Sequence, residues 1–90
     1  RGLSGVTHLP AGSGMLFVVQ LGDWFTMRHM LIGLDMVWIG RGVVLCIDPH
    51  LRPMMTDALV PPAGAEYMLE MGSGMSAGLV PGTPVSVQIL

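Results

Sequence analysis

The sequence contains no lysine and only one cysteine among its 90 residues. The absence of lysine excludes Schiff-base chemistry on a lysine and any phosphate loop that depends on one. The single cysteine, Cys46, excludes an intramolecular disulfide and a zinc site made of several cysteines. It lies inside the apolar run Val43–Ile47, where a buried cysteine acts as a small hydrophobic residue and not as a nucleophile.

Charged residues are also scarce. Four arginines face six Asp and Glu residues, so the formal net charge is −2 and no basic surface is available for a phosphate backbone. We therefore predict no nucleic-acid partner. Two stretches, 2–22 and 71–90, lack charge, but glycines, prolines and polar residues interrupt both. A spanning helix needs about 20 predominantly apolar residues, so no transmembrane segment is expected. No apolar run with a cleavage site follows Arg1, and no compartment is indicated.

The length supports one domain over residues 1–90, because a shorter unit could not bury enough apolar surface. The 13 glycines and 7 prolines divide the chain into apolar runs that are too short for most helices, and this favours strands. The expected strands are Met15–Gln20, Trp24–Met27, Met36–Ile39, Val43–Ile47, Tyr67–Met71 and Val85–Leu90.

Three local features refine this expectation. Met15–Gln20 is apolar on both faces, which predicts a central, covered strand. Gly40–Gly42 joins two apolar runs and predicts a hairpin through a three-residue connection. Pro49 and Pro53 predict that regular structure ends after Ile47 and that a polar loop follows.

Several short motifs occur in an order that resembles the family called domain of unknown function 192. This resemblance covers nearly the whole chain and departs from the family pattern at Thr26, Gly33 and near Thr83. The motifs that carry it are Arg1–Leu3 (RGL), Gly14–Val18 (GMLFV), Phe25–Arg28 (FTMR), Leu34–Ile39 (LDMVWI), Tyr67–Gly74 (YMLEMGSG) and Gly78–Val85 (GLVPGTPV).

The resemblance implies a mainly β domain, small and barrel-like or sandwich-like, built of short antiparallel strands with at most one or two short helical turns. A short N-terminal helix belongs to this expectation, and Gly72–Leu79 could hold one turn. The resemblance implies no activity. Family members carry a strand ahead of the RGL segment, whereas this chain begins at Arg1. We therefore expect an exposed sheet edge that is covered either by a second chain, as in a homodimer, or by residues outside the given sequence.

The densest polar cluster consists of Asp23, Arg28, His29 and Asp35, packed around apolar residues that include Trp24. The candidate ligand-binding residues are Trp24, Arg28, His29 and Asp35. One interpretation is a binding or accessory module, in which this cluster meets a small anionic ligand or a protein partner. The structural alternative is that Asp35 caps a turn and pairs with Arg28. A third interpretation is a small hydrolase or lyase that uses His29 and Asp35 as an acid–base pair.

The binding module is favoured over an enzyme, because neither a nucleophile nor a metal set can be assembled from the sequence, and no catalytic residue is assigned. Asp48 and His50, with His29 or Glu70, could form a metal site only if a loop brought them together. Apart from this metal site, Glu70 is interpreted as a polar residue near the end of a strand. The nine methionines, including Met27 and Met30, are interpreted as core residues and not as copper ligands. No metal and no cofactor are expected.

Overall fold

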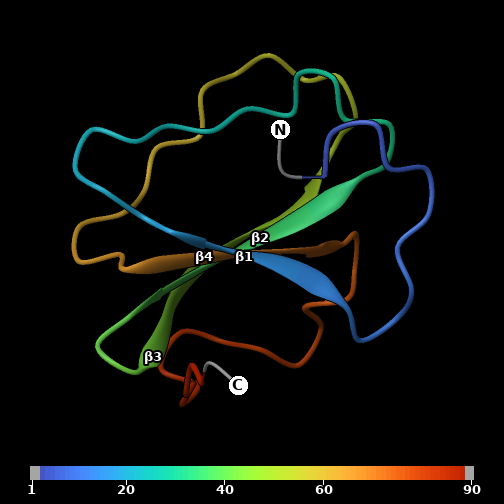
Figure 1. Ribbon diagram of the computed structural model, residues 1–90. Coiled ribbons are helices and arrows are strands. Elements are labelled where there is room, and N and C mark those ends of the chain that lie inside the picture. Colours follow the sequence, from blue (N-terminus) through green and yellow to red (C-terminus); the bar gives the residue numbers. More distant parts are fainter. Residues whose placement is uncertain (1–2, 89–90) are drawn as a thin grey trace.

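The computed structural model describes residues 3–88 and shows one open sheet of four antiparallel strands (Figure 1). The strands lie in the order β1-β4-β2-β3, and the described residues contain no helix. The prediction of a mainly β domain is confirmed, but the sheet does not close into a barrel. The strand bounds are β1 (Gly14–Val18), β2 (Leu34–Gly40), β3 (Val43–Leu51) and β4 (Tyr67–Gly72).

The predicted hairpin is formed by β2 and β3. Gly40 pairs with Val43, so the connection is the two residues Arg41 and Gly42 and not the three expected. Both have positive φ, 54° at Arg41 and 74° at Gly42, as a type I′ turn requires. The absence of a Cβ lets Gly42 adopt this conformation without strain, whereas the same conformation costs conformational energy at Arg41.

The expected break after Ile47 is wrong, because β3 continues through Pro49 to Leu51. Two conditions permit this: β3 is the outer strand next to β2, and its register with β2 shifts around Asp35. A proline is tolerated on an edge strand or at a bulge. The bulge places His50 at φ 53° with its N–H directed at the Asp35 carboxylate, 2.9 Å away.

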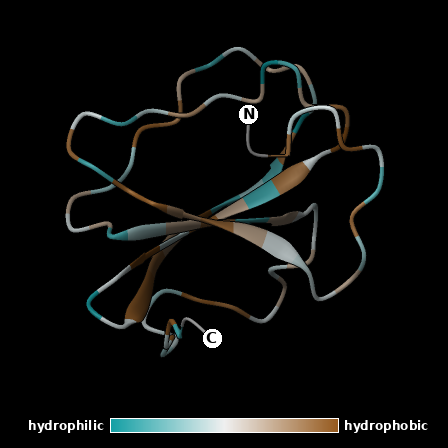
Figure 2. Cartoon of the chain, in the orientation of Figure 1, coloured by the Kyte–Doolittle hydropathy of each residue, from teal (hydrophilic) through white to brown (hydrophobic). Residues whose placement is uncertain are grey.

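The expectation of a central, covered strand near Met15 is also wrong. β1 pairs only with β4 among the described residues and forms an edge of the sheet. Leu16 is 43% exposed and Val18 is 67% exposed, so the apolar run is not covered on both faces. It crosses in front of the other strands in Figure 1 and carries hydrophobic colours in Figure 2.

Two apolar clusters lie on the two faces of the sheet. The segments that follow β1 and β3 cover the upper face in Figure 1, and the chain after β4 covers the lower face. The upper cluster contains Leu34, Met36 and Trp38 of β2 and Met68 of β4, together with Met27 and Met30. The lower cluster contains Val37, Ile39 and Val44, with Leu79 and Val85 packed against them.

Three of the expected secondary-structure elements are reduced to smaller features. The segment 24–27 forms only a single bridge, between Phe25 and Leu59. In the expected strand Val85–Leu90, the described residues 85–88 are not strand, and residues 89–90 lie outside the described part. The preceding residue, Pro84, forms a single bridge to Val43. Residues 73–78 form successive turns and no helix. Between residues 3 and 88, no helix has the length and hydrophobicity to cross a membrane.

Candidate functional site

A tight turn presents two of the predicted site residues to solvent. Met30 donates its N–H to the Met27 carbonyl at 3.0 Å, and His29 occupies the turn with φ 68°. The flanking side chains of Met27 and Met30 are buried in the upper cluster, whereas Arg28 and His29 are exposed. The two methionines therefore anchor the turn, as the interpretation as core residues predicted, and the basic pair points outward.

Side-chain hydrogen bonds hold this turn from both sides. The Thr26 hydroxyl accepts the Arg28 N–H at 3.2 Å and donates to the carbonyl of Met55, also at 3.2 Å. The Ser4 hydroxyl donates to the His29 carbonyl at 3.2 Å. The Arg28 backbone is thus fixed, while no ion pair to its guanidinium is found within residues 3–88.

A cavity of about 410 Å³ lies beside this turn. Its volume falls in the range of about 300–1,000 Å³ that small-molecule sites occupy. Three of the four predicted site residues line it, namely Trp24, Arg28 and His29. The remaining lining residues are Phe17, Val18, Asp23, Phe25, Thr26, Met30 and Glu70. The structure therefore brings these three residues together around one concave, largely apolar space.

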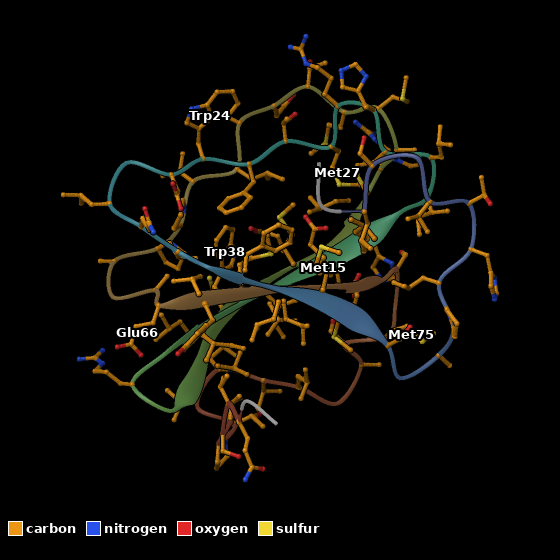
Figure 3. All side chains as sticks on the ribbon, viewed as in Figure 1. Met15, Trp24, Met27, Trp38, Glu66 and Met75 are labelled. Atoms are coloured by element: carbon orange, nitrogen blue, oxygen red, sulfur yellow. The ribbon has the colours of Figure 1, made fainter. Side chains whose placement is uncertain are left out.

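Trp24 stands at the mouth of the cavity and is 64% exposed. Figure 3 shows it projecting outward, whereas Trp38 points into the space between the sheet and the covering segments. Trp24 and Asp23 also line a second cavity of about 830 Å³, formed by residues 19–24, 58 and 60–65. That second cavity is mainly apolar and has no basic residue in its lining.

Glu70 is the buried polar residue of the 410 Å³ cavity, at 5% exposure. It lies on β4, paired across the sheet with Met15 of β1 and Met36 of β2, and neither side chain offers a donor. Its Oε1 atom has no hydrogen-bond partner among the described residues. Burial raises the pKa of this carboxyl group, and the backbone N–H of Leu3 only partly offsets the effect.

Asp35 does not join this cavity. It pairs with Met71, one position away from the pair Met36–Glu70, so its side chain projects to the opposite face of the sheet. It lines a separate cavity of about 250 Å³ together with His50 and Ser76. The pairing of Asp35 with Arg28, and the acid–base pair of Asp35 with His29, are therefore both absent from the structure.

The Asp35 carboxylate is fully buried and accepts hydrogen bonds from the backbone N–H groups of His50, Gly74 and Ser76. It also accepts one from the Ser76 hydroxyl at 2.5 Å. Burial alone would raise its pKa, but these donors together outweigh burial, and the pKa is lowered. Asp35 thus organises the distant turns at 73–78, whereas the structural alternative expected it to cap a turn at the start of the hairpin. Both of its oxygens are engaged.

The remaining candidates have structural partners. Asp48 accepts a hydrogen bond from the indole N–H of Trp38 at 2.8 Å, and the His50 ring nitrogen Nδ1 lies 2.8 Å from the Ser73 hydroxyl. No group of three metal-ligating side chains occurs within residues 3–88. Burial, and then the charge of Asp48, raise the pKa of Cys46, which disfavours a thiolate nucleophile.

The sequence model of the DUF192 family, described as an uncharacterized ACR, matches residues 1–87. The chain belongs to this family. A protein of unknown function from Novosphingobium aromaticivorans DSM 12444 is 30% identical, with a TM-score of 0.86 over 96% of this chain and 65% of that chain. A candidate transcription regulator from Sinorhizobium meliloti 1021 is 25% identical, with a TM-score of 0.80 over 90% of this chain and 67% of that chain. No curated protein matches the chain.

The DUF192 resemblance drawn from the motifs is thus confirmed, and the DUF192 chain spans about two thirds of the length of each of these two proteins. Neither the family nor these structures supply an activity, so the chemistry has to come from the site.

Sequence reasoning missed Glu70 as a site residue of this DUF192 domain. The pattern that could have revealed Glu70 is the alternation of side chains along β4. Glu70 shares a face of the sheet with the fully buried Met68, two residues earlier. An acidic residue at a core position of a strand indicates a function or a buried partner.

Proposed function

We propose that this domain is a binding module for a small anionic ligand, which it takes in the cavity between Trp24, Arg28 and His29. The observation that carries the proposal is the geometry of the Met27–Met30 turn, which holds Arg28 and His29 at the mouth of a concave apolar space. A guanidinium group binds carboxylate or phosphate through two parallel hydrogen bonds, and His29 adds a further donor.

The side chains around Arg28 support the same proposal. Trp24 offers a flat, exposed surface next to it, and Phe17 and Phe25 form an apolar wall behind it. The two phenylalanine rings pack edge to face at 5.8 Å, and Phe25 packs likewise on Trp38 at 5.7 Å. This wall is therefore part of the core, so the cavity has a rigid side against which a ligand can be held.

Binding without catalysis is the better supported form of this function. The acid–base alternative needs His29 and Asp35 together, and these residues line different cavities on opposite faces of the sheet. A nucleic-acid ligand is disfavoured by the net charge of −2, although one structural neighbour is a candidate transcription regulator.

The test is a thermal-shift comparison with two probes, 4-methylpentanoate and inorganic phosphate. We expect at least one of them to stabilise the wild type and not the Arg28→Ala variant. The Arg52→Ala variant is the matched control, because Arg52 is exposed and lies outside the cavity. Equal shifts for the wild type and for Arg28→Ala, or no shift with either probe, would contradict the proposal.

We further propose a homodimer through the edge of β1. Val19 donates its N–H to Glu66 on the side of β4, and amides alternate along a strand, so those of Leu16 and Val18 point away from β4. No strand pairs with this edge among residues 3–88. An unpaired edge with exposed apolar side chains is a template for a strand of another chain.

A further inference from the structure

We infer that the ligand of this cavity is bipolar, with a carboxylate that binds Arg28, an apolar body and an ammonium group that binds the buried Glu70. The inference rests on the anion-binding function proposed above and adds the class of ligand. It depends on three features of the cavity: an unpaired acceptor, the separation of the charges, and the apolar lining.

The unpaired acceptor is Oε1 of Glu70, which is buried and has no partner within residues 3–88. Leaving a buried polar atom unsatisfied is destabilising, and more so when the group is charged. The neighbours of Glu70 across the sheet, Met15 and Met36, cannot supply a donor. A ligand that places a hydrogen-bond donor beside Oε1 would remove this destabilisation, and its binding would be favoured accordingly.

The charges of the lining indicate which donor this is. Asp23 is engaged, because it accepts the Gln20 N–H at 2.7 Å. Arg28 and His29 are exposed at the mouth, whereas Glu70 is the buried group, so basic and acidic groups are separated by depth. An ammonium group carries several donors and a positive charge, which compensates a buried carboxylate better than a neutral hydroxyl does.

Most of the remaining lining of the cavity is apolar. Phe17 and Phe25 form one wall, and Val18, Trp24 and Met30 complete it. A ligand that matches the cavity therefore has a hydrophobic body beside its two charged groups. An amino acid with an apolar side chain is the simplest molecule with this combination.

Three probes of nearly the same shape test the inference by calorimetric titration. L-leucine carries both charges, 4-methylpentanoate lacks the ammonium group, and 3-methylbutylamine lacks the carboxylate. We expect wild-type protein to bind L-leucine at least about tenfold more tightly than either analogue, which corresponds to about 1.4 kcal/mol.

The Glu70→Gln variant isolates the buried end, since glutamine preserves the shape and removes the charge. We expect it to bind L-leucine about tenfold more weakly and 4-methylpentanoate as the wild type does. Glu66→Gln is the matched control, because Glu66 is exposed and outside the cavity. Circular dichroism melts of both variants test whether they are folded.

The outcomes separate the two proposals. If 4-methylpentanoate binds as tightly as L-leucine, or if Glu70→Gln leaves the affinity for L-leucine unchanged, the bipolar inference is overturned while anion binding stands. If neither acid binds but inorganic phosphate does, the bipolar inference is likewise overturned. If neither acid nor phosphate binds, or if Arg28→Ala binds both acids as the wild type does, the anion-binding function itself fails. Tight binding of L-leucine that is lost in both Arg28→Ala and Glu70→Gln is the result expected.

Discussion

Asp35 and Glu70 are buried carboxyl groups on adjacent strands, one position out of register, and they face opposite sides of the sheet. Asp35 has a donor at each oxygen, whereas Oε1 of Glu70 has no partner among the described residues. Their surroundings shift the two pKa values in opposite directions. One carboxyl group is therefore part of the framework, and the other is available to a ligand.

Asp35→Asn is expected to reduce the free energy of unfolding by about 2–3 kcal/mol, because an amide cannot accept the same set of donors with both of its atoms. The measurement is urea denaturation at neutral pH. Asp57→Asn, at an exposed position, is the control and should leave the midpoint unchanged. Because the folded pKa is below 3.8, the contribution of Asp35 is present above that pH and is lost as the pH falls through the folded pKa. Equal midpoints for Asp35→Asn and the wild type would contradict this.

Glu70→Gln is expected to be more stable than the wild type at pH 8, by an amount that decreases as the pH approaches 4. The folded pKa of Glu70 lies above 4.5, so the wild type loses stability as the pH rises through that folded value. Each unit of pKa shift corresponds to about 1.4 kcal/mol. The other ionisable groups of the cavity are Asp23, Arg28 and His29, and they are the same in both proteins. Unfolding curves over this pH range test the prediction, and a difference that does not depend on pH would refute it.

Leu16→Pro is expected to convert a β1-mediated homodimer into a monomer. Proline removes an amide that points away from β4, so the ladder between β1 and β4 keeps its hydrogen bonds. Leu16→Ala removes a similar apolar surface but keeps the amide, and should remain a dimer. Light scattering after size exclusion gives the mass of each protein. A wild type that is monomeric at high concentration would remove the basis of the dimer proposal.

Arg41→Asn is expected to stabilise the protein by about 0.5 kcal/mol, since asparagine followed by glycine suits a type I′ turn. Arg41 has φ 54°, a conformation that costs energy for most side chains. Arg52→Asn, which removes the same charge at an exposed position without positive φ, should have little effect. Thermal melts of the two variants provide the comparison, and equal melting temperatures would count against this account of the turn.

The sequence predicted those features that depend on local signals. The β2–β3 hairpin followed from glycines between two apolar runs, and the anchoring role of Met27 and Met30 followed from the ordinary use of methionine in cores. Pro49 was misinterpreted, because only the sheet order shows that β3 is an outer strand, where proline is tolerated. The position of β1 was missed for the same reason.

The site could be predicted only in part. Trp24, Arg28 and His29 lie close together in the sequence, and a turn keeps them close in space. Asp35 is also near these residues in sequence, but it lies on β2. The alternation of side chains along that strand places it on the opposite face of the sheet. Glu70 reaches the cavity through pairing of distant strands, which local patterns do not reveal.

The two tryptophans occupy very different surroundings, and this gives the protein its own optical reporters. Trp38 is fully buried and hydrogen-bonded to Asp48, whereas Trp24 is exposed at the mouth of the cavity (Figure 3). Their fluorescence should therefore separate into a shorter-wavelength component from Trp38 and a longer-wavelength component from Trp24 that iodide quenches. A ligand in the cavity would shield the second component alone, and unfolding would shift the first, so binding and stability can be followed in one sample without a label.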